Sequence, residues 1–125
     1  ELYPNLNFVS VESGIGWIPF LLDALDYQCG ETAPEHLKHL SMKPSEYFQR
    51  QFYGCFWFES RTLAPAIEHI GADNIMFETD YPHTDSTWPE TKQVATKLVE
   101  GLTDEQIYKI MRGNAIRMLS LDLDR

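Results

Sequence analysis

The residues best suited to chemistry lie in one segment, 78–89, whose sequence is Glu-Thr-Asp-Tyr-Pro-His-Thr-Asp-Ser-Thr-Trp-Pro. It directly follows a short apolar run, Ile75-Met76-Phe77, which is typical of a buried strand. In α/β proteins, ligands and metals bind at the carboxyl ends of the strands. The segment therefore predicts a site with ionisable side chains at the end of a strand.

Asp80 and His83 are the two candidate catalytic residues of this segment. A carboxylate at a strand end can bind a divalent metal or accept a proton, and the alternative for Asp80 is a turn or capping residue. His83 could bind metal, contact substrate or support Asp80, and the alternative is a histidine hydrogen-bonded within its loop. One Asp and one His are too few for a catalytic zinc site, which needs three protein ligands and an open position.

Other residues have both a functional and a structural interpretation. Trp88 could form the wall of a substrate pocket, or it could pack against the start of the next helix. Glu12 and Glu59 follow two other predicted strands, where each could be a loop residue or part of the site. We take Glu12 and Trp88 as candidate substrate-binding residues. The remaining histidines are expected on helices away from the strand ends: His36, His39 and His69.

The elements that must position these residues alternate between strands and helices. Strands are predicted at 8–12, 52–58 and 75–79. Helices are predicted from 17 or 18 to about 28–30, around 35–40, from 44, over 63–70, from 89 or 90, and from a capping box at 103–106 to Gly113, with a last turn or two after it. This order predicts a parallel sheet with right-handed crossovers. Parallel strands would deliver Glu12, Glu59, Asp80 and His83 to one edge of that sheet.

The composition is that of an ordinary globular domain. The 125 residues are 43% hydrophobic and 13% aromatic, enough for one domain with a core. The net charge of -9 argues against nucleic acid or an anionic membrane as a partner, and no apolar run approaches a membrane span. Cys29 and Cys55 are not spaced as a metal pair and are interpreted as free thiols in a reducing, cytoplasmic compartment.

The sequence also indicates a piece of a larger unit. It begins Glu1-Leu2-Tyr3-Pro4, without an initiator methionine. Three strands cannot close a barrel, and a (β/α)8 unit needs about 250 residues. The open sheet edge would have to be covered by another segment or by another copy of the chain, so we expect a homo-oligomer.

Four motifs in a fixed order carry a resemblance to a known family. They are the run 8–19, the run Lys43 to Phe48, the run Glu78 to His83, and Gly113-Asn114-Ala115. Together they resemble the C-terminal part of the amidohydrolase-related (amidohydrolase 2) family, in the metal-dependent group that includes aminocarboxymuconate semialdehyde decarboxylase and γ-resorcylate decarboxylase. The resemblance covers nearly the whole chain. It implies an α/β fold in which residues 1–125 form about three βα units, the C-terminal segment of a TIM-like (β/α)8 barrel.

The resemblance also implies roles for three residues. Asp80 would end the eighth strand, where the family's Asp binds the metal and helps to activate a water or orient the substrate. His83 matches the His of the Asp-Tyr-Pro-His motif near the active-site mouth, and Glu12 matches the acidic residue that ends the sixth strand. The family's His-x-His pair, its fifth-strand metal-binding His and a further catalytic His have no match here. The isolated chain is therefore expected to bind metal weakly or not at all, and to be inactive.

Two functions remain open on these grounds. The first is part of a metal-dependent enzyme that hydrolyses or non-oxidatively decarboxylates a small carboxylated or aromatic substrate, with zinc as the expected metal. The second is a non-catalytic α/β module that binds a small molecule or assembles with itself. Hydrolysis and decarboxylation cannot be distinguished by the residues in this chain.

Overall fold

The centre of the molecule is a parallel sheet whose three strands follow the order β1-β2-β3. The computed structural model describes residues 2–32 and 35–123, apart from the side chains of Thr32 and His36. The strands are β1 (Phe8–Ser10), β2 (Phe52–Phe56) and β3 (Ile75–Phe77). Gly54 in β2 pairs with Ser10 of β1 and with Ile75 of β3. The predicted parallel sheet is confirmed.

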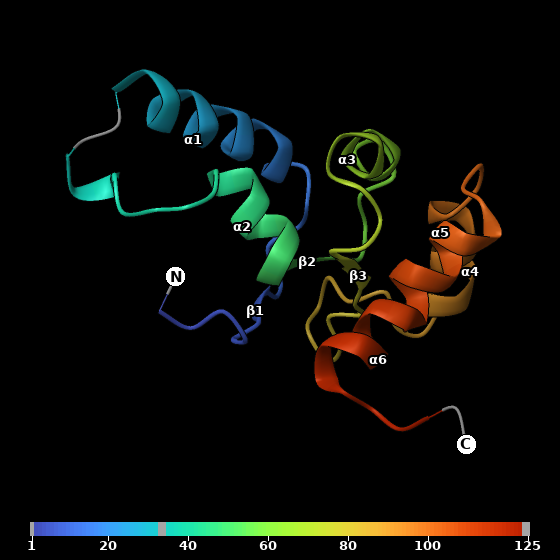
Figure 1. Cartoon of the computed structure of the whole chain (residues 1–125). Helices are drawn as coiled ribbons and strands as arrows, with labels where there is room; N and C mark the ends of the chain where they lie inside the picture. The colour runs from blue at the N-terminus through green and yellow to red at the C-terminus, as the bar shows by residue number, and fades with distance from the viewer. Residues whose placement is uncertain (1, 33–34, 124–125) are drawn as a thin grey trace.

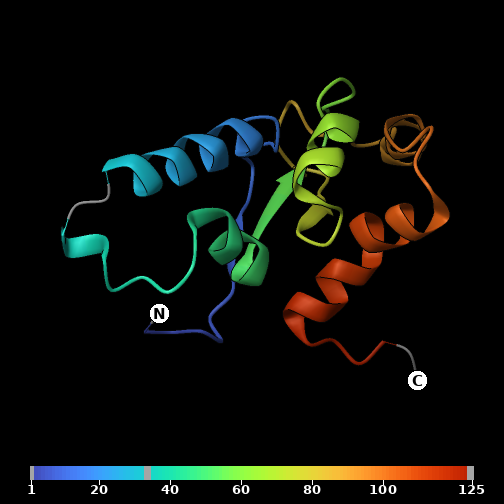
Figure 2. The same cartoon turned by 45° about the horizontal axis from the view of Figure 1, so that its top comes forward.

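Helices flank the sheet on two sides (Figures 1 and 2). They are α1 (Ile18–Thr32), the short 3-10 helix η1 (Glu35–Leu37), α2 (Pro44–Gln51), α3 (Leu63–Ile70), α4 (Thr91–Leu98), α5 (Asp104–Tyr108), the π-helical η2 (Lys109–Gly113) and α6 (Asn114–Leu119). In both views α1 and α2 lie on one side of the sheet, α4 to α6 lie on the other, and α3 lies between the two groups. Within the described part of the chain, no helix combines the length and hydropathy needed to cross a bilayer.

Both faces of the sheet are covered by apolar side chains. Phe56 and Ile75 are fully buried in the larger cluster, which also contains residues of α1, α2, α3 and η2. On the opposite face, Tyr53, Cys55 and Met76 form a smaller cluster against residues of α6. The central strand β2 is therefore buried on both faces, as its apolar sequence predicted.

Several helix boundaries agree with the sequence, whereas the short helix predicted around 35–40 is only Glu35–Leu37 and the predicted helix end at Gly113 is absent. Helix α1 begins at Ile18, α3 spans the predicted residues, and the capping box of α5 forms, with Thr103 Oγ1 accepting from Gln106 N at 3.2 Å. The predicted helix end at Gly113 is wrong, because Gly113 has helical angles (φ -59°, ψ -40°) and the helix continues through η2 into α6. A Cβ at this position would lie 2.7 Å from Tyr108 Cε1. Gly113 is therefore needed for close packing within the helix and does not end it.

All three strands stop two residues before their predicted ends. The predicted strands ran to residues 12, 58 and 79, whereas pairing ends at Ser10, Phe56 and Phe77. Glu12 and Asp80, which follow β1 and β3, have left-handed backbone angles (φ 54° and 58°) that no strand residue adopts. The residues at the strand ends that could carry chemistry thus belong to loops.

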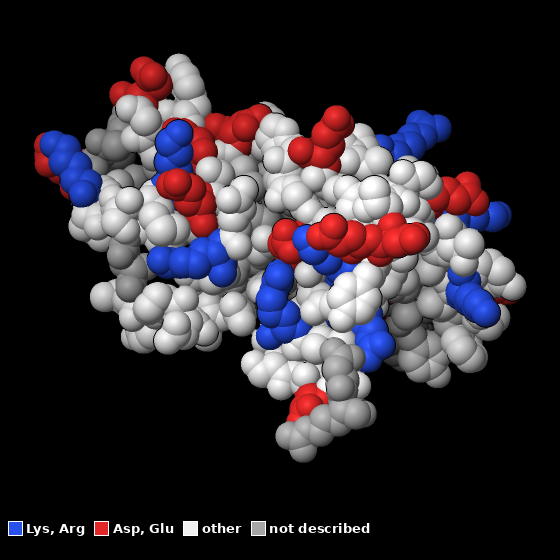
Figure 3. Space-filling view, turned by 45° about the vertical axis from the view of Figure 1, so that its right-hand side comes forward, with Lys and Arg blue, Asp and Glu red and all other residues white. Residues whose placement is uncertain are grey.

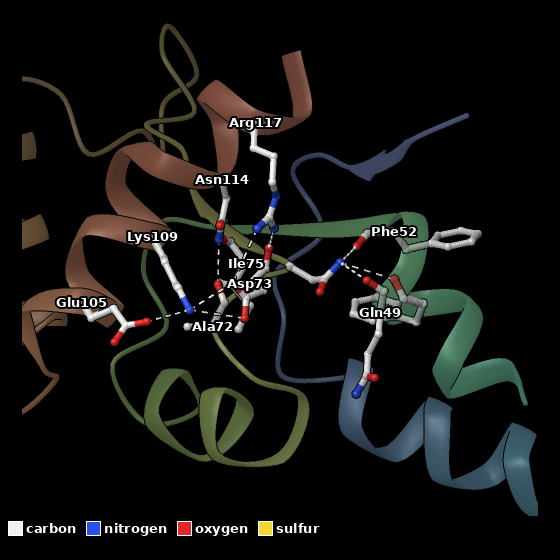
Figure 4. A network of polar contacts seen from close by, with 11 residues as sticks. Gln49, Phe52, Ala72, Asp73, Ile75, Glu105, Lys109, Asn114 and Arg117 are labelled. Carbon is white, nitrogen blue, oxygen red and sulfur yellow. Dashed lines mark hydrogen bonds and ion pairs between the residues drawn. The ribbon is translucent and has the colours of Figure 1, made fainter. Parts of the chain in front are cut away.

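A network of amides and ion pairs fastens the amino end of β3 (Figure 4). The buried Asn114 donates from Nδ2 to the carbonyl oxygens of Ala72 (2.6 Å) and Ile75 (2.7 Å). The buried Asn74 donates to Phe52 O at 2.6 Å and to Gln49 O at 3.1 Å. This end of the sheet is held by neutral groups whose polar atoms are paired.

Beside these amides, charged side chains surround Asp73 at the surface (Figure 4). Lys109 Nζ lies 3.1 Å from Asp73 Oδ1 and 3.0 Å from Glu105 Oε1. Arg117 lies 3.5 Å from Asp73 Oδ1 and also donates to the Asp73 carbonyl. The network lowers the pKa of Asp73, mainly through the hydrogen bond from Lys109.

Candidate metal centre

The opposite, carboxyl end of the sheet brings together three side chains that can bind a cation. Glu12, Asp80 and His83 each offer one ligand atom, and these atoms lie within 4.8 Å of one another. His83 Nδ1 lies 2.7 Å from Asp80 Oδ1 and 3.8 Å from Glu12 Oε2. We call these three residues the mouth cluster. It joins the loop after β1 to the loop after β3, as the parallel sheet predicted.

The loop after β3 is ordered by its own hydrogen bonds. His83 N donates to Asp80 O at 2.9 Å, and Thr87 N donates to Thr79 O at 3.0 Å. The Asp80 side chain is only 4% exposed, whereas those of His83 and Glu12 are 57% and 52% exposed. Asp80 therefore sits at the inner end of the cluster, and the other two side chains face the solvent.

The charges of the cluster favour a protonated imidazole. The pKa of His83 is raised above its ordinary value of 6.5, first by the hydrogen bond to Asp80 and then by the charges of Asp80, Glu12 and Asp85. With Nδ1 directed at Asp80 Oδ1, Nε2 is left to hold a proton that a bound molecule could accept. Asp80 and His83 thus form a carboxylate–imidazole pair.

A further carboxylate, that of Glu78, lies next to the mouth cluster, although no role was assigned to it from the sequence. Its Oε1 accepts the backbone N–H of Glu12 at 2.9 Å. Burial raises the pKa of Glu78, nearby Asp80, Glu12 and Glu59 raise it further, and only the Glu12 N–H lowers it. The sequence feature that could have identified Glu78 is its position two residues before Asp80, because alternate residues of an extended segment point to the same side.

Glu59 reaches this end of the sheet but has a different function. Its carboxylate accepts the N–H groups of Ile15 and Gly16, both at 2.9 Å. Gly14 lies beneath it with φ 67°, and a Cβ there would be 2.9 Å from Glu59 Oε1. Glu59 holds the turn before α1, because its carboxylate accepts hydrogen bonds from backbone N–H groups of that turn.

Trp88 lies beside the mouth cluster at a separate pocket. An open pocket of about 380 Å³ is lined by Thr79, Tyr81, Trp88 and Thr91. The rings of Trp88 and Tyr81 meet edge to face, with centroids 5.8 Å apart. None of the three cluster residues lines this pocket.

The other histidines do not join the cluster where their side chains are described. His69 Nε2 lies 3.3 Å from Asp23 Oδ1, on the surface between α3 and α1. His39 lines a different pocket, with Tyr47 and Phe52 among its neighbours. The side chain of His36 lies outside the described residues.

The chemistry of the mouth cluster fits a divalent metal. Two carboxylates and one imidazole provide oxygen and nitrogen donors, a set that suits Mn²⁺, Fe²⁺ and Zn²⁺. The third donor is Glu12, which the sequence suggested as a substrate-binding residue. The lone Asp and His of the sequence argument are thus joined by a further carboxylate from another strand.

Comparison with known proteins identifies the family. A family model described as Amidohydrolase matches residues 1–121, so the chain belongs to the amidohydrolase family. It is 28% identical over 124 residues to γ-resorcylate decarboxylase from Rhizobium radiobacter, covering 98% of this chain and 36% of the relative. A second γ-resorcylate decarboxylase, from Rhizobium sp. (strain MTP-10005), is 29% identical, with 96% and 36% coverage. The chain thus spans about a third of the length of these relatives.

Solved structures show the same relationship. The chain superposes on 5-carboxyvanillate decarboxylase from Sphingomonas paucimobilis with a TM-score of 0.76 and 28% identity, covering 96% of this chain and 35% of that one. It superposes on a dihydroxybenzoic acid decarboxylase from Polaromonas sp. JS666, with bound manganese and the inhibitor 2-nitroresorcinol, with a TM-score of 0.73, 26% identity, and 96% and 35% coverage. The α/β fold, as a fragment of a TIM-type barrel, is confirmed.

These comparisons bear on the two hypotheses from the sequence. The relatives and neighbours named above are decarboxylases, which supports an enzyme over a non-catalytic binding module. The manganese in the Polaromonas structure agrees with a metal-dependent family. The expectation of zinc in particular is not shown.

Proposed function

We propose that the protein carrying this chain is a metal-dependent carboxy-lyase that removes the carboxylate of a small aromatic acid without oxidation. Residues 1–125 supply three βα units of its barrel, and Asp80 is a metal ligand. The observation that carries this proposal is the convergence of Glu12, Asp80 and His83 at the carboxyl ends of parallel strands. Decarboxylation is preferred to hydrolysis because the matched relatives are decarboxylases.

The metal would be held by Asp80, with Glu12 as a further donor from this chain, and His83 would lie beside it as the proton carrier. When bound, it supplies a positive charge that polarises a substrate oxygen or carboxylate. Zn²⁺ and Mn²⁺ are both candidate metals, and a site rich in carboxylates suits Mn²⁺ at least as well as Zn²⁺.

The reaction itself exchanges a carboxylate for a proton on a ring carbon. The proton adds to that carbon, the carbon–carboxylate bond breaks, its electron pair stays with the ring, and CO₂ leaves. His83 can hold the proton at Nε2, because Asp80 orients the imidazole through Nδ1 and raises its pKa.

Trp88 and Tyr81 are proposed to contact the aromatic ring of the substrate. Their pocket of about 380 Å³ is in the size range of small-molecule sites. An aromatic pair that meets edge to face leaves ring surface available for stacking. Replacing Trp88 with Ala should raise KM more than it lowers kcat. The substrate's remaining contacts, and assembly as a homo-oligomer, would involve surfaces beyond this chain.

The decisive experiment compares Asp80→Asn with Asp85→Asn in the full-length natural protein. Asp85 is an exposed carboxylate of the same loop, outside the mouth cluster. We expect Asp80→Asn to lose bound metal and to lower kcat/KM for γ-resorcylate, the acid in the names of the two matched relatives, by about 100-fold or more. Asp85→Asn should keep both within about threefold. Metal content is measured by plasma mass spectrometry and turnover by CO₂ release. Full metal content and turnover in Asp80→Asn would refute the proposal.

A further inference from the structure

The residues of the mouth cluster lie in the loops after the two outer strands of the sheet, and these strands do not pair with each other. The strand order is β1-β2-β3, and the last paired residue of β1 is Ser10, opposite Gly54. Glu12 lies two residues beyond this pair, with a left-handed φ of 54°. The ladder hydrogen bonds therefore position β1 against β2, but they do not determine where Glu12 lies relative to Asp80.

Glu78 provides the missing connection. Its own N–H donates to Phe56 O at 2.9 Å, which extends the pairing of β3 with β2 by one residue and fixes the Glu78 backbone. From there its side chain extends past β2, and Oε1 accepts the N–H of Glu12 at 2.9 Å. One side chain thus ties the end of β3 to the backbone just after β1.

We propose that Glu78 is a positioning residue, which fixes Glu12 beside Asp80 and His83 by holding the Glu12 backbone N–H. This inference rests on the proposed function of the mouth cluster as a metal site. Glu78 itself lies outside the three residues whose ligand atoms converge. Glu78 lies near the carboxylates of Asp80, Glu12 and Glu59, and its Oε1 accepts the Glu12 N–H at 2.9 Å. A hydrogen bond to a charged acceptor is also stronger than one to a neutral group.

Two substitutions in the full-length protein separate positioning from charge. Glu78→Gln keeps an oxygen acceptor at the same reach and removes the charge, whereas Glu78→Met keeps the length and removes both. The first readout is residue-resolved hydrogen exchange of the Glu12 amide in metal-free protein. We expect exchange to accelerate about tenfold or more in Glu78→Met, and less than about threefold in Glu78→Gln.

The second readout is the dissociation constant for Mn²⁺, measured by electron paramagnetic resonance of the free ion. Affinity should fall about tenfold or more in Glu78→Met and stay within about threefold in Glu78→Gln, as expected for a group that orients a ligand. Glu59→Gln is the matched control, because Glu59 holds Ile15 and Gly16 in the same manner. It should leave both the Glu12 amide and the Mn²⁺ affinity unchanged.

Each other outcome overturns a specific statement. Equal losses of Mn²⁺ affinity in Glu78→Gln and Glu78→Met would mean that Glu78 acts through its charge. Slow exchange of Glu12 in Glu78→Met would show that the hydrogen bond does not hold this loop. Equal acceleration of the Gly71 amide, which donates to Ile67 O in α3, would indicate general loosening and also count against the proposal. Absence of Mn²⁺ binding in the unmodified protein would defeat the proposed function, while Glu12 exchange would still decide whether Glu78 positions this loop.

Discussion

The two ends of the sheet differ in the polar side chains that they carry and in how these side chains are paired. At the amino end of β3, the neutral amides of Asn74 and Asn114 are buried and donate to main-chain carbonyls. At the carboxyl end, Glu12, Glu78 and Asp80 gather, and among the described residues the ion-pair partner of Glu12 and Asp80 is His83, with no Lys or Arg paired to them. The first end satisfies every polar atom that it buries, and the second concentrates charge. We infer that stability is built at one end and function at the other.

The backbone at the carboxyl end of the sheet is strained at two residues. Glu12 and Asp80 both adopt left-handed angles, which cost about 1–2 kcal/mol each for residues with a side chain. Strain of this kind persists only where the surrounding structure enforces it, and it concentrates at functional sites. The charged residues on the face in Figure 3 are mixed in sign, with basic side chains lying among the acidic ones.

The largest effect should come from the amino end. Replacing Asn114 with Ala removes the donor for two buried carbonyl oxygens and leaves a cavity, so we expect the free energy of unfolding to fall by about 2–4 kcal/mol. Urea denaturation of the full-length protein measures this change. Asn7→Ala is the matched control, because the exposed Asn7 makes only a 3.4 Å bond to Met118 O; it should cost less than about 0.5 kcal/mol. A similarly small loss for Asn114→Ala would show that the buried amide of Asn114 does not stabilise the amino end of β3.

The next effect tests the turn that Glu59 holds at the carboxyl end of the sheet. Gly14→Ala introduces a Cβ at φ 67° and 2.9 Å from Glu59 Oε1, so it should cost about 2–3 kcal/mol. Gly101→Ala has a comparable φ of 87° and nothing within 4 Å of the added atom, so it should cost only about 1–2 kcal/mol. The difference between the two unfolding free energies isolates the contact with Glu59. No difference would show that Glu59 adapts freely and does not hold this turn.

A smaller effect is expected at the centre of the proposed site. Asp80→Asn should change the free energy of unfolding by less than about 0.5 kcal/mol, although the side chain is 4% exposed. Asn tolerates left-handed angles as well as Asp, and the change relieves repulsion among the carboxylates. The measurement must be made on metal-free protein, since bound metal would stabilise only the unmodified enzyme. A loss comparable with that of Asn114→Ala would mean that Asp80 is a structural residue.

The sequence predicted the elements better than the contacts between them. Apolar runs ending in polar residues located all three strands, and local signals such as the capping box at Thr103 located helix starts. The prediction at Gly113 was wrong because a glycine can be needed for close packing, here against the ring of Tyr108, as well as at a helix end. The link from Glu78 to the Glu12 backbone joins residues 66 positions apart in the chain, and no local pattern encodes such a contact. The parallel strand order predicted that Glu12, Glu59, Asp80 and His83 meet at one edge, whereas only the structure shows that Glu59 turns away from the other three to hold backbone N–H groups.

The smallest effects concern pH, and the two ends should respond in opposite directions. The pKa of Asp73 is lowered, so its stabilising contribution is present above the ordinary value of 3.8 and is lost as pH falls through the lowered pKa. The pKa of Glu78 is raised, so the folded state loses stability as pH rises from the ordinary value of 4.5 through the raised pKa. His83 adds a contribution that is fully present below 6.5 and is lost as pH rises through its own raised pKa.

Melting temperatures of metal-free protein between pH 3 and pH 9, compared among single variants, test these signs. Asp73→Asn should flatten only the acid limb of the curve, and His83→Gln only the limb above neutrality. Glu78→Gln should flatten the decline that begins near pH 4.5. The changes should be small, because solvent screens these partly exposed groups and salt weakens them further. If Asp73→Asn and Glu78→Gln altered the same limb, the ends of the sheet would not differ in their electrostatics, and the separation of stability from function would have to rest on the amides of Asn74 and Asn114 alone.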